Sequence, residues 1–326
     1  MVQDLKTKKK AFKLTDTVIL LIILIALIVF FSVANRQFIA YANISTMLKN
    51  MVLTGVLALG LTPLMIARGL DISFGSAISM ISVIMALLYS KAGMNLWVVL
   101  IIGVVIAVVI GFINGFLIET FDLMPIILTL GMMAILQALA LVFANTYAET
   151  YSILMLTDEL YVFATRTIFG IPYPLIVLIV LIAIYWFVLS RTKVGRTIYL
   201  IGANPKVAKL SGIKVKKVKI LLYVFMGLAT GIASIIIVAL TGVGMSYHGA
   251  KLPLPVLSAV LLGGISLMGG SGSVWGTTIG VLIVTVIFNG LSVLNVPSYF
   301  IQLFQGLALI IIVAAYEVRN KRAAIH

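Results

Sequence analysis

The sequence predicts an all-α membrane protein that crosses the bilayer about ten times, and three observations support this. Hydrophobic residues make up 63% of the 326 residues, charged residues only 10%, and the mean hydropathy is +1.25. Soluble domains carry roughly 25% charged residues. Ten apolar runs approach the ~20 residues that a spanning helix needs. Finally, the Lys and Arg residues gather on one side of the membrane when all ten runs are treated as helices.

The ten runs follow one another through a single expected transmembrane domain, residues 17–316. A basic tail, residues 1–16, precedes it, and a C-terminal tail, 317–326, follows it. No small-residue cleavage site follows the first run, so this run is expected to remain as the first helix. The eighth run is short and ends in glycines. The runs cover residues 17–34, 47–67, 75–90, 96–118, 124–144, 173–190, 220–241, 254–268, 275–294 and 299–316.

The charge distribution predicts the orientation. With ten spans and the N-terminus inside, eighteen of the 23 Lys and Arg residues lie on one side and five on the other. Cytoplasmic loops carry the excess of Lys and Arg, so both tails and segment 191–219 are expected inside and loop 145–172 outside. The net charge of +14 is thus interpreted as a topology signal, with some contacts to anionic membrane lipid, and no nucleic-acid binding is expected.

The basic segment 191–219 carries nine basic residues and no acidic one between two apolar runs. A short helix is expected within residues 203–212. Asn204 would be its N-cap, Pro205 its first helical residue and Gly212 the residue just past its end. A segment that only joined two spans would need a few residues, so this one is interpreted as a docking surface for a soluble protein.

Side chains of this short helix supply the expected contacts. Lys206 and Lys209 are three residues apart and would share one face, where they could meet acidic residues of a partner. Ala208 is small and would let the helix seat closely in a groove of that partner. The alternative is a helix that faces lipid headgroups and has no partner.

Two interruptions of the apolar pattern are rich in glycine and serine. Segment 66–80 is either a capped tight turn at the cytoplasmic surface or a hinge near a transport path, with Ser76 or Ser73 as N-cap of the next helix. Segment 261–276 has six glycines, but it lacks the strand context and the Lys of a phosphate-binding loop, so close helix packing is expected. The residues proposed for the path or hinge are Gly69, Asp71, Ser73, Gly75, Ser76 and, in the ninth run, Asn289. For Asn289 an interhelical hydrogen bond is the first expectation and path lining is the alternative.

A weak internal repeat is also present. Blocks 47–144 and 220–316 each hold four runs with an interruption near the start, at 68–75 and 242–255. Five spans separate their starts, so the blocks would have opposite orientations, as in many transporters.

Three motifs resemble those of one family along essentially the whole chain. RGLDISFGS (68–76) is similar to that family's GGIDLSVGS. TKVGRTIYLIGANPKVAKLSGI (192–213) is similar to T-x-x-G-R-x-x-Y-A-I-G-x-N-x-x-A-A-x-x-S-G-I, and LLGGISLMGGSGSVWG (261–276) to V-L-G-G-x-S-L-x-G-G-x-G-S-x-x-G. The chain therefore resembles bacterial ABC-transporter permeases for ribose, xylose, galactose and related simple sugars. Members of this family also carry autoinducer-2, inositol or nucleosides.

The resemblance implies a multi-pass permease of the bacterial inner membrane with several partners. These are a cytoplasmic ATP-binding subunit pair, an extracytoplasmic sugar-binding protein and a second permease subunit, identical or paralogous. The chain departs from the family at Lys251, where Glu is common, and at the nearby Pro253 and Pro255, which bears on how the outer partner docks. The residues implied to couple the chain to the ATPase are Gly195, Arg196, Asn204, Pro205, Lys206, Ala208, Lys209, Ser211 and Gly212.

Other classes of function find little support in the residues. An ion-coupled secondary transporter would place Asp, Glu or His within the membrane, and Asp71 is the single candidate near a span. The chain has no cysteine and two histidines, and no His, Asp and Glu cluster has metal-ligand spacing. Neither a cofactor nor a catalytic site is therefore expected, and an integral-membrane enzyme is disfavoured.

Overall fold

The computed structural model describes residues 14–148 and 151–325, and helices dominate this part of the chain. Two short antiparallel strand pairs are also present in it, β1 with β4 and β2 with β3. In chain order the elements are α1 (Leu14–Ala34), the 3-10 helix η1 (Arg36–Ile39), α2 (Tyr41–Ile66), α3 (Phe74–Ser90), α4 (Leu96–Phe121), α5 (Pro125–Ala148), β1 (Ser152–Leu154), α6 (Asp158–Thr165), β2 (Thr167–Ile168), β3 (Ile171–Pro172), α7 (Tyr173–Arg191), α8 (Lys193–Ala203), α9 (Pro205–Leu210), α10 (Val215–Thr241), β4 (Val243–Met245), α11 (Pro253–Leu262), α12 (Val274–Val293) and α13 (Ser298–Ile325).

The predicted fold class, an all-α polytopic membrane protein, is confirmed. Within the described residues, α1, α2, α4, α5, α7, α10 and α12 are long and apolar enough to cross a bilayer. The other three predicted runs correspond to α3, α11 and the first half of α13, which are shorter apolar helices. The eighth run, 254–268, is not a full span. Its helix α11 has ten residues, about 15 Å, because Gly263 and Gly264 end it and Gly264 has a positive φ of 85°.

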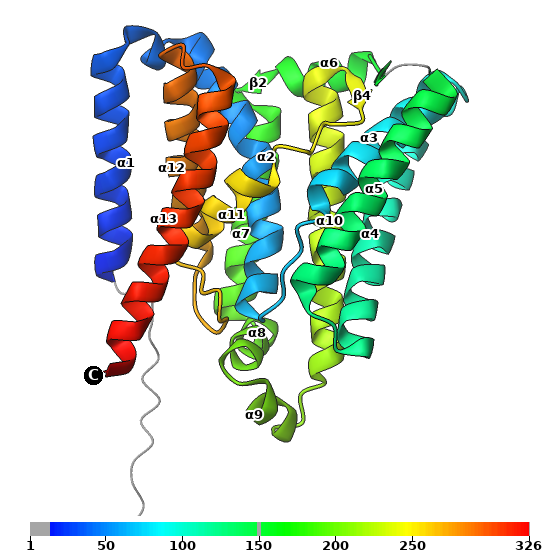
Figure 1. Cartoon of the computed structure of the whole chain (residues 1–326). Helices are drawn as coiled ribbons and strands as arrows, with labels where there is room; N and C mark the ends of the chain where they lie inside the picture. The colour runs from blue at the N-terminus through cyan, green and yellow to red at the C-terminus, as the bar shows by residue number, and fades with distance from the viewer. Residues whose placement is uncertain (1–13, 149–150, 326) are drawn as a thin grey trace, which may run out of the picture.

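Helices α2 and α10 form the centre of the bundle (Figure 1). Every residue of α2 from Met51 to Ile66 is buried, which is why this span carries threonines and glycines among its apolar residues. Close packing of α10 on α4 depends on small residues. A Cβ on Gly227 would overlap the carbonyl oxygen of Ala107, and one on Gly111 would overlap that of Tyr223. Such small-residue contacts let membrane helices approach closely.

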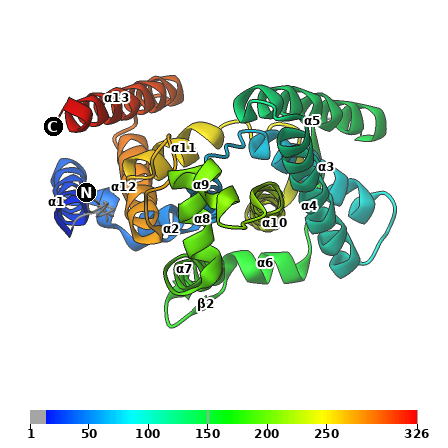
Figure 2. The same ribbon diagram turned by 90° about the horizontal axis from the view of Figure 1, so that it is seen from below.

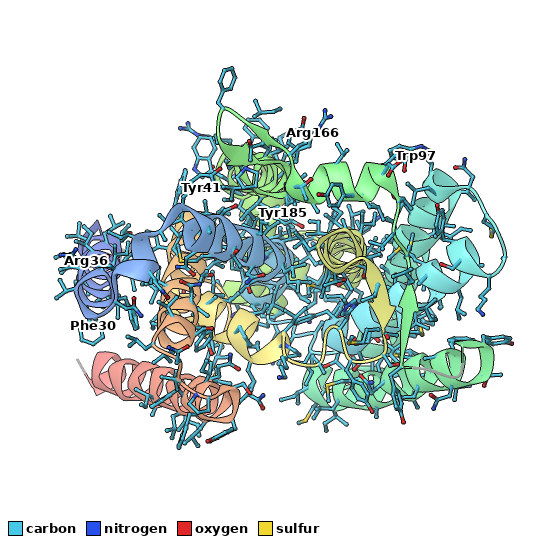
Figure 3. The ribbon with its side chains drawn as sticks, turned by 90° about the horizontal axis from the view of Figure 1, so that it is seen from above. Phe30, Arg36, Tyr41, Trp97, Arg166 and Tyr185 are labelled. Atoms are coloured by element: carbon cyan, nitrogen blue, oxygen red, sulfur yellow. The ribbon has the colours of Figure 1, made fainter. Side chains whose placement is uncertain are left out.

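The two ends of the bundle differ in their elements. The end with α6 and the strand pairs lies opposite the end with α8 and α9 (Figure 1). Figure 3 shows the first of these ends from above, with Arg36 and Arg166 at its rim. Tyr41 and Trp97, near the starts of α2 and α4, are exposed there, as aromatic residues at a membrane–water interface are.

The contacts between helices repeat as the internal symmetry predicts. Helix α2 contacts α12 just as α10 contacts α4, and α3 contacts α4 and α5 just as α11 contacts α12 and α13. The cross-contacts match too, since α3 touches α10 and α11 touches α2. Helices α2 to α5 run in the directions opposite to those of α10 to α13 (Figure 1). The two blocks therefore form an inverted repeat, with α3 and α11 as its short helices.

Candidate coupling site

The basic segment folds into α8 and α9, which lie across the middle of the bundle when it is viewed from below (Figure 2). Helix α9 has the predicted caps. The Asn204 Oδ1 accepts hydrogen bonds from the backbone N–H groups of Lys206 at 3.0 Å and Val207 at 3.2 Å. At the other end Gly212 has a φ of 80°, and its N–H bonds to the Lys209 carbonyl at 3.1 Å. The caps thus come from the residues that the sequence indicated.

Ala208 does not lie where the sequence interpretation placed it. Its side chain is 2% exposed and belongs to the chain's own hydrophobic core, so it cannot seat in a partner's groove. The exposed apolar residues of α9 are instead Val207, at 51%, and Leu210, at 88%. They are three residues apart and share a face. The rotation of α9 about its axis follows from packing within the chain, which the spacing of residues alone does not give.

The other predicted coupling residues divide by role. Gly195 is buried, and a Cβ there would overlap the Leu189 carbonyl oxygen. Glycine therefore permits the sharp bend between α7 and α8. Arg196, Lys206 and Lys209 are exposed. The Ser211 hydroxyl donates to the Val207 carbonyl at 3.0 Å and so belongs to the end of the helix. Of the nine, only the exposed residues can contact a partner directly.

Three segments that are far apart in sequence meet at the end of α8. The backbone N–H of Gly270 donates to the Ile66 carbonyl at 2.8 Å, and a Cβ on Gly202 would overlap both of these groups. The Tyr199 hydroxyl donates to the Gly272 carbonyl at 2.9 Å. Burial raises the pKa of the Tyr199 phenol, so its hydroxyl remains a donor. The coupling corner, defined as residues 199–204, is thereby joined to both interrupted segments.

Arg68 adds a further link, to which the sequence interpretation gave no role: it counted this residue as a topology charge and as a departure from the Gly-Gly of the resembling family. Its Nε donates to the Gly202 carbonyl at 2.7 Å and its Nη2 to the Ala203 carbonyl at 3.0 Å. The available signal was its place within the RGLDISFGS motif, where the resembling family has glycine.

Most of the first interrupted segment is buried within the protein, although Arg68 is exposed where α2 ends. Asp71 is 3% exposed, and its Oδ1 accepts from the backbone N–H of Ser73 at 2.8 Å and from the Ser73 hydroxyl at 2.6 Å. Its Oδ2 accepts from the Asn114 amide at 3.3 Å. Ser73 does hold the N-cap position of α3, but its hydroxyl bonds to Asp71, and Ser76 lies inside the helix. Buried partners are what permit such irregular backbone at membrane depth.

Gly75 brings the two short helices together. A Cβ at this position would lie 2.6 Å from the Gly249 carbonyl oxygen and 3.0 Å from the Cγ of Pro253, the first residue of α11. Gly69 is equally constrained, since a Cβ there would overlap the Leu64 side chain. The starts of α3 and α11 therefore pack against each other, and five of the six predicted path or hinge residues lie in this one region.

Asn289 lies apart from this region. Its amide donates to Asn43 Oδ1 at 3.0 Å, and the Asn43 amide donates back to Asn289 Oδ1 at 2.9 Å. This reciprocal pair joins α12 to α2, so Asn289 makes the interhelical hydrogen bond that was its first expected role.

Charged pairs hold the first turns of α10 to the end of α4. Lys219 bonds to Glu119 at 2.7 Å with both side chains largely buried, and Lys216 lies 3.5 Å from Asp122 at the surface. Two of the nine basic residues of segment 191–219 are thus paired within the chain. The buried pair is the one that would cost several kcal/mol, roughly 3–5, to break by removing a single partner.

Comparisons with known proteins agree with this architecture. A family model described as "Branched-chain amino acid transport system / permease component" matches residues 43–313. The autoinducer 2 import system permease protein LsrD of Yersinia enterocolitica is 32% identical, covering 83% of this chain and 82% of the relative. Its counterparts of the same name from Yersinia pseudotuberculosis and Yersinia pestis are 30% and 29% identical, each covering 93% of this chain and 92% of the relative.

No solved structure matches the chain. The family and its relatives are transport components of import systems and not enzymes. The matched span contains both interrupted segments and the whole coupling corner. The chain therefore belongs to the family of branched-chain amino acid transport system permease components, which are multi-pass inner-membrane subunits of bacterial ABC importers.

Proposed function

We propose that this chain is the membrane-spanning subunit of an ATP-driven importer whose energy comes from a separate cytoplasmic ATP-binding subunit pair. The observation that supports this most directly is the coupling corner, which is hydrogen-bonded to the first interrupted segment through Arg68 and to the second through Gly272. Gly270 bonds in turn to Ile66 and so joins the two segments to each other. Because packed protein elements shift as units and do not deform continuously, a displacement of the corner would reach the starts of α3 and α11.

The surface of α9 fits a partner of definite chemistry. Val207 and Leu210 present an apolar centre, with Lys206 and Lys209 exposed around it. Protein interfaces combine an apolar core with a polar rim of complementary charge. The proposed ATP-binding subunit would therefore offer an apolar groove edged by acidic residues. This proposal places α8, α9 and both tails on the cytoplasmic side.

The transport step would be alternating access within a pair of permease subunits. The α3–α11 junction, with Gly75 at its closest contact, supplies the moving part. At the opposite end, α6 and the β1–β4 pair would receive the substrate-loaded binding protein. Lys251 is exposed in the segment between β4 and α11. Affinity for the substrate would reside mainly in that binding protein, because the buried polar side chains here are mostly hydrogen-bonded within the chain, to backbone groups or to one another.

The proposed substrate is a simple sugar or a related small hydroxylated molecule. The three motifs favour a simple sugar, and the names of the relatives favour autoinducer-2 within the same class. A thermal-shift screen of the associated binding protein against sugars, inositol, nucleosides and autoinducer-2 would separate these substrates. A shift with none of them would contradict the proposed class.

The proposed mechanism is tested by reconstitution. The chain is placed in vesicles with its ATP-binding subunit and binding protein, and uptake is measured with ATP, with a non-hydrolysable analogue and with an imposed proton or sodium gradient. We expect uptake with ATP alone. Uptake driven by an ion gradient without ATP would instead identify an ion-coupled transporter.

A further inference from the structure

Arg68 is the basic side chain of the first interrupted segment, and it reaches across to the coupling corner. Its guanidinium donates at 2.7 Å and 3.0 Å to the carbonyls of Gly202 and Ala203. These two residues end α8, where backbone carbonyls lack partners within the helix and carry the negative end of its dipole. A fixed positive charge with two donors is well suited to this position.

The backbone at Arg68 indicates that its side chain is needed. Arg68 follows the end of α2 with a φ of 64°, its N–H bonded to the Met65 carbonyl and that of Gly69 to the Leu64 carbonyl. This is a Schellman end, in which the left-handed residue is usually glycine. An arginine there carries a backbone cost that glycine would avoid. The two hydrogen bonds from the Arg68 guanidinium to the carbonyls at the end of α8 offset this backbone cost.

The link made by Arg68 is separate from the links made by the second interrupted segment. Tyr199 bonds to Gly272, and Gly270 bonds to Ile66, without any contribution from the guanidinium. Loss of the Arg68 bonds would therefore remove the direct hydrogen bonds between the corner and the first interrupted segment, while Tyr199 would keep the corner attached to the second segment, which stays joined to Ile66 through Gly270. The Arg68 side chain can therefore be removed while the Tyr199–Gly272 and Gly270–Ile66 hydrogen bonds remain in place.

We propose that Arg68 is a positioning residue that latches the coupling corner to the first interrupted segment and so keeps ATP turnover low until the loaded binding protein docks. This inference rests on the proposed function. While the latch is closed, the corner and the end of α2 move as one body, and the partner cannot shift the corner alone. Docking at the opposite end would shift the inverted repeat and open the latch.

The test compares Arg68→Gly, Arg68→Lys and a control, Arg36→Ala, whose arginine is exposed at the other end of the molecule. Glycine removes the guanidinium and suits the left-handed backbone. Each variant is reconstituted with the ATP-binding subunit, and hydrolysis is measured with and without the loaded binding protein. For Arg68→Gly we expect faster unstimulated hydrolysis and a stimulation ratio lower by roughly tenfold, the scale of a lost hydrogen bond to a charged group. The control should match the wild type.

The stimulation ratio of Arg68→Lys should lie between that of Arg68→Gly and that of the wild type, because an ammonium keeps the charge but cannot make the forked pair of hydrogen bonds. A wild-type ratio in Arg68→Gly would overturn the latch, yet ATP-driven uptake by that variant would leave the proposed function intact. A lowered melting temperature in Arg68→Gly, with no recovery of the ratio in Arg68→Lys, would show a merely structural role and would also overturn the proposal. Failure of every protein, wild type included, to assemble with the ATP-binding subunit would count against the proposed function itself.

Discussion

At the scale of single residues, the structure depends on positions where any side chain would separate backbones that must touch. Gly202 is the clearest case, because its Cα faces the Ile66 carbonyl and the Gly270 N–H, which are hydrogen-bonded to each other. Gly131 and Gly306 offer a contrast, since a Cβ at either would meet no atom within 4 Å. The same residue type thus has a packing role in one place and none within this chain in the other.

Gly202→Ala should therefore destabilise the protein, whereas Gly131→Ala should not. Overpacking of this kind costs about 1–3 kcal/mol, while an alanine in an open helical position is worth up to about 1 kcal/mol of helix propensity. Thermal unfolding of the purified protein in detergent measures both. Equal melting temperatures for the two variants would show that the three segments do not meet at Gly202.

At the scale of elements, α9 has six residues, too few to be stable without its caps and its contacts with the rest of the chain. Asn204→Ala removes the acceptor of two backbone N–H groups, a loss of about 1 kcal/mol. We expect faster hydrogen exchange at residues 206–210 and weaker stimulation of the ATP-binding subunit, with little change in overall stability. Asn145→Ala, at the exposed outer end of α5, is the matched control. Unchanged exchange in α9 would contradict the assigned N-cap.

Local sequence patterns predicted the bounds and caps of α9 well, but they predicted its rotation about its own axis poorly. Asn204, Pro205 and Gly212 act within one turn of their own positions, so the residue types alone indicated the caps. The reach of Arg68 depends on a segment more than a hundred residues away along the chain, and the burial of Ala208 depends on how α9 packs against α8 and α10. Tertiary packing decides these contacts. The run at 254–268 is short and ends in glycines, which indicated an early end, but its predicted bounds still extended past the end of α11 at Leu262.

At the scale of the whole molecule, the inverted repeat joins the proposed cytoplasmic docking surface to the outer end through two short helices that start beside each other. This arrangement needs α9 and α6 on opposite sides of the membrane. The chain has no cysteine, so Lys209→Cys and Asp158→Cys each introduce a single thiol. In intact cells, an impermeant thiol reagent should label Asp158→Cys and should leave Lys209→Cys unlabelled until the cells are broken open. The reverse pattern would invert the proposed orientation.

The central claim is that α9 docks on an ATP-binding subunit, and site-specific crosslinking tests it most directly. A single cysteine is introduced at Leu210, the most exposed apolar residue of α9, and, as a control, at Phe169, which is fully exposed at the opposite end. A thiol-to-amine crosslinker is then applied to the assembled complex. The account predicts a crosslinked product with the ATP-binding subunit from Leu210→Cys and none from Phe169→Cys. No product from Leu210→Cys in a complex that still hydrolyses ATP and transports substrate would contradict it.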